Sequence, residues 1–137
     1  MSCQNFDLKL IQPDIVILSK HDDCYSLELN LKAFIFDQNI IDTSIKFSEI
    51  ELPTSNLEEL IGLKMQLSDE ESQIFDGCLT LNHVHIPVDL MQIEFVQTRE
   101  NTLKAIMKLF IDFESTQTNE YLNLELIVNA NVASTIL

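Results

Sequence analysis

The pattern that decides the fold is found in LKAIMKLFIDFE (residues 103–114), where apolar side chains occupy every second position. The same alternation continues in YLNLELIVNANV (121–132) and ends an earlier run at MQIEF (91–95). A period of two places successive side chains on opposite faces of a strand. Three such strands in succession, joined by short polar connections, predict an antiparallel meander within residues 84–132.

Shorter apolar runs precede the meander. We expect further strands over residues 6–11, 15–18, 25–36, 41–52 and 74–81, which brings the total to about seven or eight. Pro13 and Pro87 are expected at edges or bends, because proline cannot donate a hydrogen bond to a sheet. The predicted core consists of Phe6, Leu8, Leu27, Leu29, Leu31, Ile35, Phe47, Leu57, Leu60, Ile61, Leu79, Ile93, Phe95, Leu109, Ile111, Phe113, Leu124 and Leu126.

One short helix is expected between these strands. Ser55 and Glu58 form the S-x-x-E pattern of a capping box. Apolar or long side chains follow at helical spacing, at Leu57, Leu60, Ile61, Lys64 and Met65. The predicted fold is therefore mainly β and forms a single domain over residues 1–137. It is an antiparallel β-sandwich or a strongly curled sheet with one helix, and an α+β arrangement is the alternative.

The composition restricts both turns and partners. With two glycines, most turns are expected to be longer loops built on Asp, Asn and Ser. The chain has 22 acidic and 8 basic residues, for a net charge of −14, which disfavours nucleic acid and anionic lipid and favours a basic partner. No apolar run approaches the roughly 18 residues of a membrane span, and residues 1–7 lack a secretory signal.

The cysteines agree with a cytoplasmic location. There are three, without a CxxC motif, as is typical of reduced thiols in the cytosol. We expect Cys24 and Cys78 to be small buried hydrophobic residues on strands. The thiols are expected to stay reduced.

No motif of a known catalytic class occurs, and two glycines cannot form a phosphate-binding loop. His83 and His85 would share one face of a strand and are the candidates closest to a metal site, but Cys78 or Asp89 would have to supply a third ligand. The neighbouring carboxylates at 22–23 and 69–71 lack the alternating spacing of a calcium loop. We therefore expect no metal, no cofactor and no enzymatic activity.

The acidic residues are most concentrated over residues 49–76. Eight acidic residues stand here against Lys64 alone, at Glu49, Glu51, Glu58, Glu59, Asp69, Glu70, Glu71 and Asp76. A focused negative field speeds the binding of a basic partner. We therefore expect this segment to be the partner-binding surface, and the alternative is a solvated face without a partner.

The expected function is that of a small acidic cytosolic binding protein that neutralises or chaperones a basic protein, such as a toxin or nuclease. Bacterial immunity proteins and antitoxins are of this physical type, although the analogy rests on charge and size and not on matched residues. The alternative is a structural or assembly subunit that uses the meander as an interface and forms homo-oligomers through strand edges. An enzyme is the third hypothesis.

Overall fold

The computed structural model describes residues 5–21, 24–50, 59, 61–62, 64–66, 75–81, 83–97, 102–116 and 121–134. The chain is mainly β with little helix, as expected. Its elements in chain order are η1 (Leu8–Leu10), β1 (Pro13–His21), β2 (Cys24–Leu31), β3 (Phe34–Phe36), β4 (Asn39–Ile41), β5 (Ser44–Ile50), β6 (Lys64–Gln66), β7 (Phe75–Leu81), β8 (Val84–Gln97), β9 (Leu103–Ile111), η2 (Phe113–Ser115) and β10 (Leu124–Ser134).

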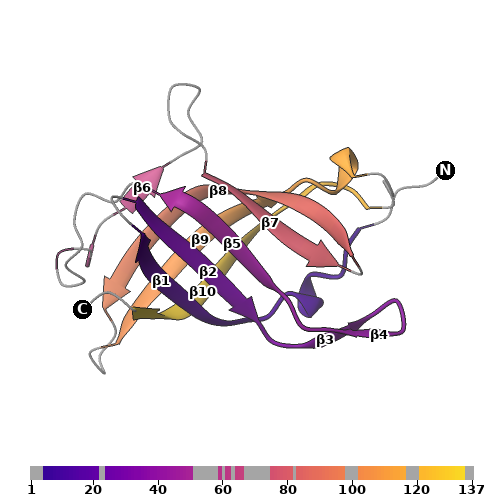
Figure 1. Ribbon diagram of the computed structural model, residues 1–137, viewed down its shortest axis with the longest axis horizontal. Coiled ribbons are helices and arrows are strands. Elements are labelled where there is room, and N and C mark those ends of the chain that lie inside the picture. The colour runs from indigo at the N-terminus through magenta and orange to yellow at the C-terminus, as the bar shows by residue number, and fades with distance from the viewer. Residues whose placement is uncertain are drawn as a thin grey trace.

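Seven strands close on themselves into a barrel, so the expected β-sandwich is wrong (Figure 1). Neighbouring strands follow the order β8-β7-β5-β2-β1-β10-β9, and β9 pairs again with β8. The closure depends on β8, whose 14 residues pair first with β7 and then with β9. Its register shifts between Leu90 and Gln92, and such a bulge bends a strand.

The predicted meander is confirmed in β8, β9 and β10. Leu109 in the middle of β9 lies opposite Leu90 on β8 and Leu126 on β10. The alternating residues Ala105, Met107, Leu109 and Ile111 are buried, as the period of two predicted. The sheet is not wholly antiparallel, however, because β1 and β10 pair in parallel.

The barrel interior is filled by side chains. Small barrels are narrow enough for inward-facing residues to meet across the axis. The largest fully buried side chains are those of Phe47, Phe95, Leu18, Leu27, Leu29, Ile45, Leu79, Leu90, Ile93 and Met107. Within the described part of the chain, Ser26 is the one buried polar residue.

Four aromatic rings pack together at one end of the barrel. Phe6 from the N-terminal segment stacks on Phe113 of η2 with ring centroids 5.1 Å apart, and meets Tyr121 edge-on at 5.3 Å. Phe36 of β3 completes the group, 5.4 Å from Phe6. The relative orientation of the rings in each pair stabilises the contact beyond the apolar area that the rings bury. This aromatic cluster therefore joins the N-terminal segment to the strand ends.

Three predicted strands differ in the structure. The strand predicted over 41–52 begins at Ser44 as β5, because Ile41 belongs to the hairpin strand β4. Residues 6–11 form no strand; η1 begins where the Asp7 carboxylate accepts a hydrogen bond from the Lys9 amide at 3.0 Å, and Leu8 is exposed. The strand predicted over 25–36 ends at Leu31, because β3 leaves the barrel and forms a separate two-stranded sheet with β4. Ile35 therefore lies on the outside of a separate hairpin, 70% exposed, and not in the core.

The region of the predicted helix is described only in part. Glu59 is helical, whereas Ser55, Leu57, Glu58 and Leu60 lie outside the described residues. Ile61 is exposed, not buried. Residues 64–66 do not continue a helix but form β6, which pairs with β8.

A tight turn on Asp and Asn residues is confirmed: Asp37 and Gln38 form a two-residue turn with positive φ angles between the paired Phe36 and Asn39, without glycine. The placement of residues 84–88 differs from the prediction. Val84–Val88 is not a separate edge segment but the first part of β8, paired with β7.

Candidate interaction surface

Among the described residues, the side chains that make up the buried core of the barrel are apolar. A ligand or partner must therefore meet the outer surface. The outer wall is not uniform: where β1 and β10 meet, the barrel has a seam.

The seam exists because the parallel ladder between β1 and β10 is short. It runs from Ile15 opposite Asn131 to Leu18 opposite Ser134. Upstream of Asn131, the strand partner of residues 124–130 among the residues that the structure describes is β9 alone. On the other side of the seam, the chain between η1 and Pro13 runs past β10 without joining the ladder. β1 begins at Pro13. Proline has no N–H to donate to a neighbouring strand, which favours the start of the strand at this residue.

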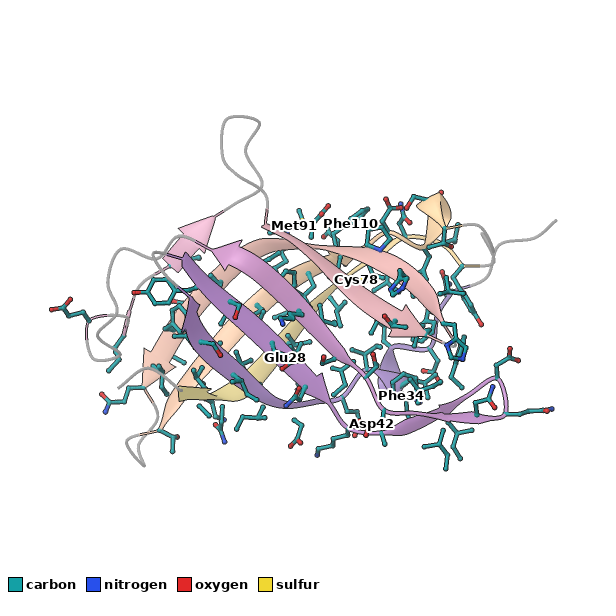
Figure 2. All side chains as sticks on the ribbon, in the orientation of Figure 1. Glu28, Phe34, Asp42, Cys78, Met91 and Phe110 are labelled. Carbon is teal, nitrogen blue, oxygen red and sulfur yellow. The ribbon has the colours of Figure 1, made fainter. Side chains whose placement is uncertain are left out.

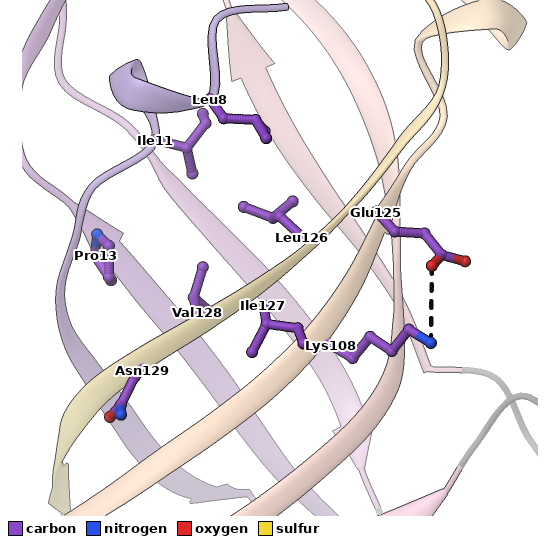
Figure 3. Close-up of a pocket in the computed structure, with 9 residues that line it drawn as sticks. All are labelled: Leu8, Ile11, Pro13, Lys108, Glu125, Leu126, Ile127, Val128 and Asn129. Carbon is purple, nitrogen blue, oxygen red and sulfur yellow. Dashed lines mark ion pairs between the residues drawn. The ribbon is translucent and has the colours of Figure 1, made fainter.

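A hollow of about 660 Å³ lies at this seam (Figure 3). The N-terminal segment lines one side of the hollow and β9 and β10 line the other. The lining residues are Leu8, Ile11, Pro13, Lys108, Glu125, Leu126, Ile127, Val128 and Asn129. We name this site the seam hollow. Its size is within the range of about 300–1,000 Å³ that binding pockets occupy.

The seam hollow is largely apolar, with charge at its rim. Ile127 points outward from β10 and is 70% exposed, although it lies between Leu126 and Val128. Lys108 Nζ and Glu125 Oε2 form an ion pair at 3.7 Å, with side chains 40% and 52% exposed. An ion pair this exposed contributes little to the stability of the fold. At the rim of the seam hollow, its two charges are available to a binding partner.

The acidic surface predicted over residues 49–76 is only partly within the described residues. Glu59 is exposed. Glu49 lies on β5 and Asp76 on β7, which are neighbouring strands. Glu51, Glu58, Asp69, Glu70 and Glu71 lie outside the described residues. In strand order β5 and β7 are far from β10, so Glu49 and Asp76 belong to a different part of the wall from the seam hollow.

The two histidines of the metal hypothesis lie in different environments. His83 is in the turn before β8 with φ of 70°, so the pair does not share one regular strand. His85 faces β7, where its Nδ1 lies 3.1 Å from Thr80 Oγ1 and 3.6 Å from Cys78 Sγ. Cys78 (labelled in Figure 2) is half-buried beside His85 and is not the fully buried residue that was expected.

The contacts of Cys78, Thr80 and His85 do not match those of a catalytic triad. Cys78 and Thr80 both contact the same ring nitrogen of His85, whereas a nucleophile–base–orienting-group triad uses both nitrogens. Among the residues that the structure describes, no group of three or more His, Cys, Asp or Glu side chains could hold a metal ion. The geometry gives neither a complete catalytic triad nor a complete metal site here.

The site predicted from the sequence did not include Ile127, although the sequence contains a signal that this residue is exposed. Leu126, Ile127 and Val128 are three consecutive apolar residues in a strand that otherwise alternates. The middle residue must then face away from the core, and an apolar residue there is unfavourable unless something covers it.

Comparison of the chain with protein-family models, with curated proteins and with solved structures gave no significant match. No helix within the described ranges is long and apolar enough to cross a membrane.

Proposed function

We propose that the protein binds a basic protein partner and that the seam hollow is the centre of the contact. The main support is Ile127, a large apolar side chain that is 70% exposed in a hollow on the outer wall. The filled interior supports an external site. The excess of 22 acidic over 8 basic residues supports a partner of opposite charge.

The two features act on different steps of binding. Apolar side chains that become fully buried at the centre of an interface hold the complex together and mainly slow dissociation. Charges spread over the surface raise the association rate, and salt weakens their effect. In this proposal Ile127 supplies the anchor, while the acidic residues, including those of segment 49–76, attract the partner. The role that fits is neutralising or chaperoning a cationic protein in the cytoplasm, as immunity proteins do.

Affinity capture with matched variants tests this function. The immobilised protein is exposed to lysate of the source organism beside Ile127→Asp and the control Ile40→Asp. Ile40 is 78% exposed on β4, so both variants add the same charge at an exposed isoleucine. We expect one basic protein to be retained stoichiometrically by the parent and by Ile40→Asp, and lost by Ile127→Asp. Retention by all three, or enrichment of no basic protein, contradicts the proposal.

Self-association is the second candidate function, because the same hollow lies on the outer face of the meander. A second copy would have to bring together two chains of −14 each, which opposes association at low salt. Sedimentation equilibrium of the purified protein separates the two candidates. A dimer that dissociates on Ile127→Asp but not on Ile40→Asp would favour the assembly subunit.

A further inference from the structure

We infer that the seam hollow takes an extended segment of the partner as an added strand along β10. This inference rests on the proposed function and specifies the form of the ligand: a β-strand with alternating apolar and basic side chains.

The first argument is the free edge of β10. Within the described part of the chain, residues 124–130 pair with β9 on one side and have no strand partner on the other. Among the described residues, none of the backbone hydrogen bonds outside the regular ladders involves this stretch. A strand directs main-chain N–H and C=O groups alternately to its two sides, so this edge presents a row of groups ready to pair.

The second argument is that the neighbouring N-terminal segment cannot close the seam. The amides of Leu10 and Ile11 donate to Asp7 O and Leu8 O within η1, both at 3.1 Å. The carbonyl of Gln12 accepts from the Lys32 amide at 2.9 Å, and Pro13 has no amide hydrogen. These donors and the Gln12 acceptor are already paired, and Pro13 has no donor, so none of them bonds to the edge of β10.

The third argument is the chemistry of the hollow. Leu8 and Ile11 on one side and Leu126 and Val128 on the other would surround alternate side chains of an inserted strand, which favours apolar residues there. The intervening side chains would lie on the outer face beside Glu125 and Ile127, where long aliphatic stems would cover Ile127 and charged ends would reach the rim. The net charge of −14 favours lysine or arginine at these positions. Addition of a strand to a sheet edge combines main-chain hydrogen bonds with such alternating pockets.

The test uses a synthetic peptide of alternating valine and lysine, as long as residues 124–130 and blocked at both ends. Two controls keep its charge and side chains but carry N-methyl groups on alternate residues, along one edge or along the other. Amide hydrogen exchange of the full-length protein, followed by NMR, reports where the peptide binds. We expect alternate amides within 124–130 to be protected. One N-methylated control should bind weaker by about tenfold or more, because it loses several main-chain hydrogen bonds, and the other should bind like the parent peptide.

Three results would overturn the inference. Equal affinity of both controls would mean that charge alone attracts the peptide. Protection at β3, β4 or β6 instead of β10 would identify a different edge, and the absence of binding would exclude strand addition by this class of segment. These failures are distinct from failure of the proposed function: a basic protein captured in an Ile127-dependent way, with no β10 protection by the peptide, would mean that the partner docks as a folded surface.

Discussion

Phe47 on β5 and Gly77 on β7 lie opposite each other, and the Phe47 ring fills the space that a side chain at position 77 would need. A Cβ atom at Gly77 would come within 2.5 Å of two ring carbons and 2.9 Å of the Lys46 carbonyl oxygen. Phe47 is fully buried. The narrow barrel can thus hold this large ring only because its neighbour across the ladder has no side chain.

Gly77→Ala is therefore expected to destabilise the protein, even though alanine is easier to place in a strand than glycine. Overpacking of this kind costs about 1–3 kcal/mol. Urea unfolding followed by circular dichroism measures the loss. Adding Phe47→Leu to Gly77→Ala should restore part of the stability lost by the alanine alone. Unchanged stability of the single variant would show that the ring can move aside.

Leu109→Ala is expected to cost about 2–5 kcal/mol, because a fully buried leucine leaves a cavity in a packed interior. The neighbouring Lys108 points out of the barrel, and Lys108→Ala should change the free energy of unfolding by less than about 1 kcal/mol. Chemical denaturation of the two variants compares the faces of β9 directly. Similar losses in both would contradict the face assignment.

The meander could be predicted from sequence because its information is local. Alternation in residues 103–114 determines which face is buried, and Leu109 and Ile111 lie where the pattern placed them. Alternation does not determine which strands meet. Closure needs β1 to pair with β10, more than 110 residues later in the chain, and needs β8 to pair on both sides. For that reason the sandwich was predicted in place of the barrel.

The seam hollow could not be predicted from the sequence for a similar reason. It depends on the end of the β1–β10 ladder at Ile15 and on the 3-10 turn at η1. The predicted strand over residues 6–11 overlooked the capping of η1 by Asp7. Pro13 did signal a bend or an edge, but only the structure shows which strand it leaves unpaired. The acidic segment 49–76 remains a prediction, since most of its residues are outside the described ranges.

Phe6→Ala is expected to loosen the N-terminal wall of the seam hollow. Phe6 is buried and contacts three other rings of the aromatic cluster. Loss of a buried phenylalanine costs about 3–5 kcal/mol when the surroundings cannot collapse. Thermal denaturation should show the loss of stability, and faster amide exchange in residues 8–12 should show its effect on the wall. Unchanged exchange there would mean that the wall is held without the cluster.

Neutralising part of the acidic segment is expected to slow association and leave folding intact. Glu59→Gln, Asp69→Asn, Glu70→Gln and Glu71→Gln together remove four negative charges. Exposed carboxylates gain little from isolated pairs, so stability should stay the same or rise slightly. Stopped-flow mixing with the captured partner should show a lower association rate with a weaker salt dependence. An unaltered rate would leave segment 49–76 as a solvated face and assign the attraction of the partner to the meander's outer side, around Gln92, Glu94, Lys104, Lys108, Asn123 and Glu125.

Site-specific photo-crosslinking at position 127 tests the central claim most directly. A photoreactive amino acid replaces Ile127 in one protein and Ile40, which is also strongly exposed, in another, and each is irradiated in lysate of the source organism. Mass spectrometry then identifies the adducts. We predict a basic protein joined at position 127, through one of its extended segments, and no such adduct at position 40. The absence of an adduct specific to position 127, or an acidic partner there, would contradict a binding site at the seam hollow.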